Sequence, residues 1–477
     1  MDQCVVQIGR CAVDQFGKAA AVAARVRTMV HDGTLRGGDA LPSTRALAAE
    51  LGVARGTVVA AYEQLDGEGY IRTRHGAAAR VVASVEHAAT APARTGTRSL
   101  LPSSGDLAAD VVDARPGIPA VTAIAPRDWR AAWRAAADLP LRNTLSDPLG
   151  LPSFRDQVAA QLGLSRGFAP DPSRVVVTAG TAEALSLVTE ALRTRLGRAP
   201  RIAVEDPGYR AGRRAVTSAG GVLVPVPVLA DGIWLPGLAA VTVDAVLVTP
   251  THQYPLGSVM PVGARQELLA WAAATDTLVV EDDYDSEFRH RGRPVPALAA
   301  LSSAVLHVGG FSKTLDPRLR CAYVVLPEDP ATSEAVVGAR TARGPVVAEP
   351  VQAALAHLLR TGAFRRHLGR VRRDYTHRRA AIAARLRPAA GRLPPVPGLE
   401  ARALDGGLHT VVTWPGAPAS TELVARLAAR GVLVSDLADY AVTRGSVGNG
   451  IVLGYGALTL PALEHALDAL VEELAAG

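Results

Sequence analysis

Residues 309–320 read GGFSKTLDPRLR, a turn of small residues that places Lys313 behind a serine and Arg320 seven positions further on. The apolar run AVLHVG (304–309) leads into this turn, and a second run, CAYVVL (321–326), follows it. Short runs rich in β-branched residues are typical of strands. The sequence therefore predicts that Lys313 lies in a connection between two buried strands.

The chain upstream of this turn alternates between further apolar runs and helical stretches. The helical stretches include AEALSLVTEALRTR and ARQELLAWAAAT. The apolar runs are RVVVTA (174–179), RIAVE (201–205), AVLVTP (245–250) and TLVVEDD (277–283). Such runs between helices indicate an α/β fold with a mostly parallel central sheet that is buried on both faces. From about Val351 the pattern begins with long helices and ends in a smaller α+β region.

The bulk composition indicates a globular protein of more than one domain. A length of 477 residues exceeds one ordinary hydrophobic core, so we expect two or three domains. A hydrophobic content of 48% with 20% charged residues is typical of soluble proteins. The net charge of +6 permits binding to nucleic acid but does not require it.

The cysteines and the N-terminus indicate a cytoplasmic protein. Cys4, Cys11 and Cys321 form no CxxC pair and have no metal-ligand spacing, so we expect no metal site and a reducing compartment. The N-terminus lacks a signal pattern. No uncharged apolar run reaches about 18 residues, so no membrane span is expected.

A change of composition after residue 84 divides the chain. Residues 85–117 are rich in Ala, Ser, Thr, Pro and Gly and show no helical or strand period, which is typical of a linker. We therefore expect a first domain over residues 1–84 and a second over residues 118–477. The second is expected to have a large part at about 140–350 and a small part at about 351–477.

The first domain has the pattern of a winged helix-turn-helix. Residues 19–32 predict one helix, Ser43 can cap a second that runs to about Leu51, and a third runs from about Arg55 to Glu68. A strand, turn and strand follow around Gly76. In such a domain the N-terminal residues of the third helix lie at base edges in the major groove of double-stranded DNA. The expected DNA-contacting residues are Arg45, Arg55, Thr57, Arg72, Arg74 and His75.

The stretch LPSTRALAAELGVARGTVVAAYEQLDGEGYI (41–71) is similar to the winged helix of the GntR family of bacterial regulators, and the resemblance covers about residues 19–83. Two positions differ from that family. Ala54 stands where a small hydroxyl residue usually caps the recognition helix. The wing reads Gly76-Ala77-Ala78-Ala79, whereas the family usually has glycine, a small residue and glycine.

The second domain offers the groups that hold pyridoxal 5′-phosphate (PLP). A Schiff-base lysine needs a partly dry pocket, a carboxylate for the pyridine nitrogen, a phenol for the 3′ oxygen, and amides with a guanidinium for the phosphate. Strand ends and strand-to-helix turns carry candidates for each role. They are Lys313 as the Schiff-base lysine, Asp282 and Tyr284 for the ring, Gly180, Thr181, Ala182, Ser312 and Arg320 for the phosphate, and Tyr209 for the ring face.

Residues 143–460 resemble fold-type I aminotransferases, and in particular the domain that is fused to a winged helix in MocR-type regulators. The motifs THQYPLGSVM (251–260), EDDYDSEFR (281–289) and FSKTL (311–315) carry the resemblance. It implies the same roles for these residues and places His252 and Gln253 beside the ring. The subfamily commonly has threonine at the position of Gly310.

The resemblance also implies an arginine that clamps an amino-acid carboxylate just before the strand IVLGY (451–455). The sequence there is SVGNG, and the nearest arginine is Arg444. We therefore expect a regulator, not an enzyme, that binds operator DNA and senses PLP, as regulators of vitamin B6 synthesis genes in this family do. The alternatives are a sensor of an amino acid through PLP, a working aminotransferase, and a DNA-binding protein whose large domain only dimerises. The resemblance further suggests a head-to-tail homodimer.

Overall fold

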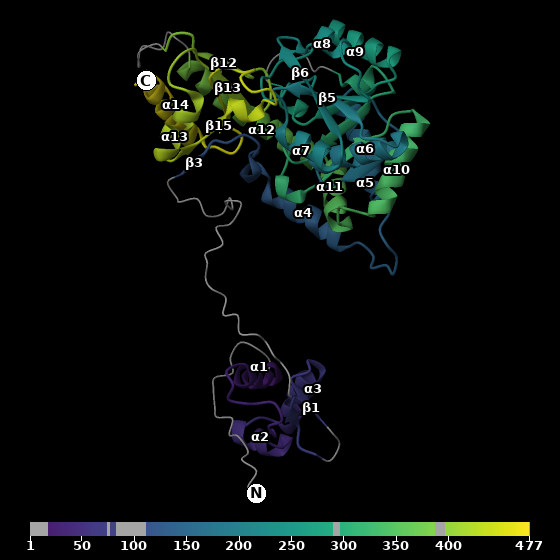
Figure 1. Cartoon of the computed structure of the whole chain (residues 1–477), viewed down its shortest axis with the longest axis vertical. Helices are drawn as coiled ribbons and strands as arrows, with labels where there is room; N and C mark the ends of the chain where they lie inside the picture. The colour runs from purple at the N-terminus through teal and green to yellow at the C-terminus, as the bar shows by residue number, and fades with distance from the viewer. Residues whose placement is uncertain (1–17, 74–76, 83–110, 290–295, 387–395, 477) are drawn as a thin grey trace. The chain divides into compact units, whose positions relative to one another are not determined.

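The computed structural model describes residues 18–73, 77–82, 111–289, 296–386 and 396–476. The chain divides into two compact units, Met1–Asp106 and Leu107–Gly477. Figure 1 shows the described elements of each unit. Among the described residues, no helix combines the length and the apolar character that crossing a membrane requires.

The first unit consists of three helices and a short hairpin. The helices are α1 (Lys18–His31), α2 (Thr44–Leu51) and α3 (Arg55–Gly67), and β1 (Ile71–Arg72) pairs antiparallel with β2 (Arg80–Val81). Their apolar faces form one core around Val26, Leu47, Val58 and Leu65, all fully buried. This arrangement confirms the predicted winged helix-turn-helix.

The helix ends of this unit follow from single residues. The Oγ of Ser43 accepts a hydrogen bond from the amide of Ala46 (3.2 Å), which caps α2 as predicted. Gly52 ends α2 in the left-handed region with φ +66°. Ala54, in contrast, caps α3 with no side-chain hydrogen bond.

The second unit is built on an eight-stranded sheet in the order β4-β11-β10-β9-β8-β5-β6-β7. Neighbours from β10 through β6 are parallel, whereas β11 runs antiparallel to both of its neighbours and β7 antiparallel to β6. The strands are β4 (Val175–Thr178), β5 (Arg201–Asp206), β6 (Val222–Leu229), β7 (Gly232–Ile233), β8 (Ala245–Val248), β9 (Leu278–Asp283), β10 (Leu306–Gly310) and β11 (Ala322–Val325). This topology confirms the mostly parallel α/β sheet.

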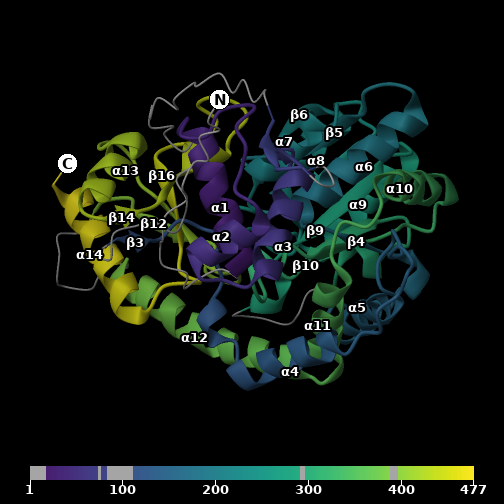
Figure 2. The ribbon, with the colours of Figure 1, turned by 90° about the horizontal axis from the view of Figure 1, so that it is seen from below.

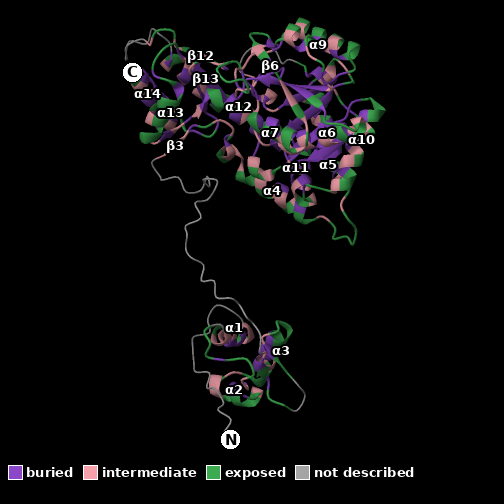
Figure 3. Cartoon of the chain, viewed as in Figure 1, coloured by how far each residue is buried: buried purple, intermediate pink, exposed green. Residues whose placement is uncertain are grey.

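Helices cover both faces of this sheet, so its residues alternate between two cores. Val176 packs into one apolar cluster, and its neighbours Val175 and Val177 pack into another on the opposite face. Figure 3 shows buried residues gathered on the strands in the interior of this unit, whereas β6 is mostly half-buried or exposed. The helices are α4 (Pro126–Ala137), α5 (Pro152–Ser165), α6 (Thr181–Leu196), α7 (Arg210–Ser218), α8 (Leu235–Ala239), α9 (Val262–Ala274), α10 (Pro330–Arg343) and α11 (Glu349–Arg360).

The rest of the second unit is a smaller α+β layer. Its sheet has the order β12-β13-β16-β15, and β3 pairs parallel with β14 beside it. The elements are β3 (Val112–Asp113), β12 (Glu400–Arg402), β13 (His409–Thr413), β14 (Val432–Leu433), β15 (Ser435–Asp436), β16 (Gly450–Gly454), α12 (Ala363–Arg385), α13 (Ser420–Ala429) and α14 (Leu460–Ala475). Short 3-10 turns occur at Val121–Ala123, Pro172–Arg174, Ser286–Phe288, Leu298–Ala300, Pro317–Leu319 and Leu437–Tyr440.

Two features differ from the sequence-based expectation. Strand β6 was not among the expected strands; it contains Pro225 and Pro227, and proline is rare in strands because it lacks an amide donor. The fold accommodates them at the margin of the sheet, where only the two-residue β7 lies outside β6. Residues 111–117, the end of the expected linker, are joined to the second unit, because β3 pairs with β14 and the Gly117 carbonyl accepts a hydrogen bond from Lys313.

The two caps of the first unit give a paired test. Replacing Ser43 with Ala removes the bond to Ala46, and replacing Ala54 with Ser supplies a cap that α3 lacks. Ser43→Ala should lower, and Ala54→Ser should raise, the stability of this unit by about 0.5–2 kcal/mol. Hydrogen exchange of the amides in α2 and α3 measures both changes, and equal protection in both variants would contradict the capping argument.

Candidate cofactor site

A cavity opens at the edge of the large sheet where the parallel strands end. Because the carboxyl ends of such strands meet at one edge, the turns after β4, β5, β9 and β10 converge there. Nine of the eleven expected cofactor residues line this cavity. Its walls are Gly180, Thr181, Ala182, Tyr209, Tyr254, Asp282, Tyr284, Gly310, Ser312, Lys313, Pro317 and Arg320.

Lys313 lies half-buried in this cavity and is held from one side. Its Nζ donates a hydrogen bond to the carbonyl oxygen of Gly117 (2.7 Å). Burial lowers the pKa of the Lys313 amine, and the carboxylates of Asp285 and Asp282 oppose that effect. A lowered pKa favours the neutral amine, which is the form that attacks an aldehyde.

Asp282 is the least satisfied group of the cavity. Its side chain is only 4% exposed, and its Oδ1 has no hydrogen-bond partner among the described residues. Burial raises the pKa of Asp282 to about 8, and the neighbouring Asp283 and Glu205 carboxylates add to the effect. A buried carboxyl without a partner is costly. A protonated ring nitrogen would supply the missing donor, so this residue fits the pyridine end of PLP.

The opposite end of the cavity is suited to a phosphate. Thr181 begins the sixteen-residue helix α6, whose first amides and positive dipole end favour an anion. Arg320 lies there with its Nη2 donating to the carbonyl of Ala179 (2.8 Å). Gly180 has φ +109°, and a Cβ on it would stand 3.2 Å from this Nη2. Glycine therefore gives both the turn and the space that the guanidinium needs.

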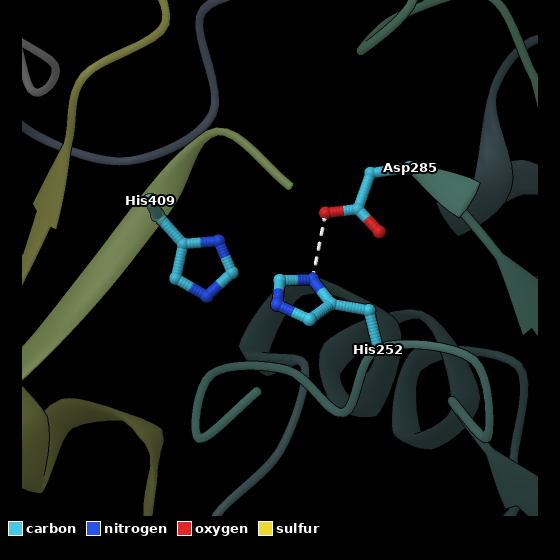
Figure 4. A group of neighbouring side chains, drawn as sticks. All are labelled: His252, Asp285 and His409. Atoms are coloured by element: carbon cyan, nitrogen blue, oxygen red, sulfur yellow. Dashed lines mark hydrogen bonds and ion pairs between the residues drawn. The ribbon is translucent and has the colours of Figure 1, made fainter. Parts of the chain in front are cut away.

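The hydroxyl of Tyr284 is supported from behind by a buried histidine. The Nδ1 of His252 lies 3.0 Å from the Tyr284 hydroxyl oxygen and 2.9 Å from Oδ2 of Asp285. His409 lies next to His252 and Asp285, with its ring centroid 5.2 Å from that of His252. The Nε2 of His409 donates to the carbonyl of Pro255 (2.9 Å). Figure 4 shows the three side chains together.

His252, Asp285 and His409 combine two imidazoles and a carboxylate, which are groups that can bind metal ions. One potential ligand atom from each of His252, Asp285 and His409 lies within 4.8 Å of the others. In this structure the His252–Asp285 bond engages two of the three. Burial, and then His252, lowers the pKa of His409 to about 4. The arrangement as described thus acts as a hydrogen-bonded support for Tyr284.

The structure does not bring His252 or Gln253 into the cavity wall. The Gln253 amide donates to Glu205 Oε2 (3.2 Å) and to the carbonyls of Pro207 (2.9 Å) and Tyr254 (2.8 Å). Its side-chain amide is therefore engaged by Glu205 and by two backbone carbonyls and does not face the cavity. Sequence reasoning missed Tyr254 as a lining residue, although this aromatic follows Gln253 directly.

The place of the expected carboxylate clamp is filled by a structural residue. The Oδ1 of Asn449 accepts a hydrogen bond from the amide of Ser420 (3.1 Å) at the start of α13, and its Nδ2 donates to the carbonyl of Gly416 (2.6 Å). Arg444 is exposed and does not line the cavity. The described walls of the cavity therefore contain one arginine, Arg320.

In the first unit, the expected DNA contacts that the structure describes lie near the starts of α2 and α3 and on the hairpin. Arg45, Arg55 and Arg72 are exposed, and Thr57 is half-buried. The Nε of Arg55 lies 3.5 Å from Thr44 Oγ1, so Arg55 stands next to the first turn of α2. Two of the expected contacts, Arg74 and His75, lie outside the described residues.

Comparison with known proteins agrees with this two-part architecture. The family described as "Bacterial regulatory proteins, gntR family" matches residues 18–81, and "Aminotransferase class I and II" matches residues 119–469. The regulator of pyridoxine biosynthesis PdxR from Corynebacterium glutamicum is 38% identical over 439 residues, which cover 91% of this chain and 90% of that protein. The probable rhizopine catabolism regulatory protein MocR of Rhizobium meliloti is 35% identical over 378 residues, covering 76% and 75%.

This chain belongs to the MocR-type regulators of the GntR family. Membership confirms the predicted fusion of a DNA-binding winged helix with an aminotransferase-like domain. Kynurenine aminotransferase from Pyrococcus horikoshii shares the fold of the second unit with a TM-score of 0.68 and 24% identity, over 76% of this chain and 91% of that one. The fold-type I assignment is thereby confirmed as well.

The raised pKa of Asp282 gives a test of stability against pH. Its folded-state pKa lies above its ordinary value, so the carboxyl costs stability as pH rises from about 4 to about 8. Asp282→Asn keeps the shape and removes this cost. The free energy of unfolding of the variant should exceed that of the wild type by about 1–4 kcal/mol at pH 7.5 and equal it near pH 4.

Urea unfolding of the second unit at both pH values measures this difference. Asp283→Asn serves as the control, because Asp283 accepts a bond from the buried Arg166 Nε (2.5 Å) and its loss should destabilise. An Asp282→Asn variant that is less stable than the wild type at pH 7.5 would show that Asp282 has a partner.

Proposed function

We propose that this protein is a transcriptional regulator that senses PLP itself at the Lys313 cavity and controls genes of vitamin B6 synthesis. The observation that carries the proposal is the unpartnered, buried Asp282 carboxyl in the same cavity as the half-buried Lys313 amine. The name of the relative PdxR, a regulator of pyridoxine biosynthesis, supports the choice of genes.

Different residues of the cavity would hold different parts of the cofactor. When bound, PLP supplies an aldehyde that reacts with amines and a coloured conjugated ring. Lys313 would hold it covalently, Asp282 would pair with the ring nitrogen, and Tyr284 would donate to the 3′ oxygen. Gly180, Thr181, Ala182, Ser312 and Arg320 would hold the phosphate, and Tyr209 would face the ring.

The Gly117 carbonyl gives the sensor a route to the rest of the chain. It belongs to the segment that enters the second unit from the linker, and β3 of that segment is tied to β14 by the bond from the Val112 amide to the Gly431 carbonyl (2.8 Å). A Lys313 amine that is bonded to the cofactor would no longer donate the same hydrogen bond to the Gly117 carbonyl. Cofactor binding would thus change the contacts of residues 111–117 with the second unit. A switch requires such a difference in contacts between its free and bound states.

The effector class follows from the missing clamp. An α-amino acid needs a guanidinium for its carboxylate, and the described cavity walls offer only Arg320 at the phosphate end. This favours PLP over an amino acid as the signal. We also propose a cytoplasmic, head-to-tail homodimer that binds operator DNA, with residues 1–84 as the DNA-binding domain, 85–117 as the linker and 118–477 as the sensor.

The decisive experiment titrates binding of operator DNA with and without PLP. The wild type should turn yellow with PLP and change its operator affinity, whereas a panel of amino acids should add nothing. Lys313→Ala should lose both the colour and the response to PLP but keep basal operator binding. A wild type whose operator affinity ignores PLP and responds to one amino acid would overturn the choice of effector.

A second candidate is an aminotransferase, favoured by the shared presence of Lys313, Asp282 and Tyr284 in the cavity. It predicts steady conversion of an amino donor to its 2-oxo acid with a 2-oxo acid acceptor. We expect no turnover above that of Lys313→Ala, because no described residue clamps the substrate carboxylate. Measuring the 2-oxo product by chromatography separates an enzyme from a sensor.

A further inference from the structure

The most basic element of the chain is not in the DNA-binding unit. Helix α12 (Ala363–Arg385) carries eight arginines and one aspartate, a net +7, whereas the whole chain carries +6. Residues 1–84, in contrast, contain ten Lys/Arg against eight Asp/Glu. The positive charge of this regulator is therefore concentrated on a helix of its aminotransferase-like unit.

These charges are sorted onto one face of the helix. Its inner face buries Phe364, Leu368, Val371, Tyr375 and Ile382 in the core. Its exposed basic residues are Arg365, Arg366, Arg372, Arg373 and His377. The two arginine pairs are seven residues apart, so two helical turns bring them to the same side. The stripe from residue 365 to 377 extends over about 18 Å.

Few of these arginines are neutralised by the protein itself. Among the described residues, Arg366 pairs with Asp128 (3.4 Å), and Arg365, Arg372 and Arg373 form no ion pair. Arg372 instead donates to the backbone carbonyl of Glu287 (2.5 Å). Several like charges on one face repel each other unless an external anion faces them.

The helix beside α12 extends the same surface. In α4 (Pro126–Ala137) the exposed arginines are Arg127, Arg130 and Arg134, at the i, i+3 and i+7 spacing of one helical face. The bond between Arg366 and Asp128 joins the two helices, and Figure 2 shows both along one edge of the unit. We take the exposed arginines of these two linked helices together as the α4–α12 surface.

We propose that this α4–α12 surface binds the phosphate backbone of double-stranded DNA next to the operator. Arginine forks match phosphate oxygens, and duplex DNA presents one negative charge per about 1.7 Å of its axis, enough for a stripe of this length. Backbone contacts of this kind position a protein without reading sequence. The inference rests on the proposed operator binding, to which it adds a second contact region.

The tether between the units favours DNA as the occupant over other polyanions. Residues 83–110, which join the two described units, number 28 and can separate their ends by at most about 100 Å. A duplex held by the first unit therefore stays within reach of the second unit at a high effective concentration. The modest charge excess of residues 1–84 leaves room for a second electrostatic contribution to affinity.

The test compares two operator fragments with the full-length, PLP-loaded protein. One covers only the recognition site, and the other extends it by about 30 base pairs, roughly 100 Å, on each side. The variant R365Q/R366Q/R372Q/R373Q should bind the long fragment about tenfold or more weakly while binding the short one as the wild type does. Its slope of log affinity against log salt should fall by up to about 3.6, or about 0.9 per lost phosphate contact.

The matched control, R193Q/R201Q/R214Q/R402Q, removes four exposed arginines elsewhere and should leave the long-fragment affinity and salt slope near those of the wild type. Equal behaviour of the two quadruple variants would overturn the proposal, and so would an equal loss on both fragments. Vesicles with anionic lipid form a third arm: binding that the stripe variant loses there, with DNA binding intact, would assign the surface to membranes. Failure of the wild type to bind either fragment would instead refute operator binding itself. Retention of the PLP colour by both variants shows that they are folded.

Discussion

A buried carboxyl beside a half-buried amine is the constraint on which the second unit depends. Asp282 lies 4% exposed at the end of β9, and no described residue satisfies its Oδ1. Lys313 comes from the turn after β10, the strand that pairs in parallel with β9. Because parallel neighbours deliver their C-terminal turns to one edge, the sheet topology brings acid and amine together. The proposed cofactor, with its ring cation and its aldehyde, would offset the cost of that arrangement.

The sequence predicted these central groups because each lies directly at a strand end, where spacing along the chain reports position in space. Lys313, Asp282 and the turn at Gly180 are cases of this kind. Sequence reasoning could not place groups whose role depends on several separate segments. Asp285, just after β9, and His409, on β13, meet His252 from separate segments, and Gln253 turns toward Glu205, since burial decides which neighbour satisfies an amide. Strand β6 was missed because its prolines are tolerated only at a sheet margin, which is a tertiary property.

The same distinction explains the first unit. Its helices end where single residues dictate, at Ser43 and Gly52, so local chemistry was sufficient to predict them. The linker prediction was less complete. Residues 111–117 lack a periodic pattern, yet they are ordered by pairing with β14 and by the Lys313–Gly117 bond. An aperiodic segment can thus be ordered when distant residues supply its hydrogen bonds.

The basic helix α12 and the Lys313 cavity belong to the same unit and are in contact. A sensor that merely bound its ligand would have no need of this arginine stripe on α12. Arg365, Arg372 and Arg373 form no ion pair among the described residues, and each exposed charge of this kind adds repulsion to the folded unit. The cavity and the stripe draw on the same scaffold: His367, on the inner face of α12, lies within 3.0 Å (Nε2) of the carbonyl of Thr314, the residue after Lys313. The residue that follows Lys313 therefore contacts the helix that carries the arginine stripe. This contact gives cofactor binding a physical route to the proposed DNA surface, independent of the linker.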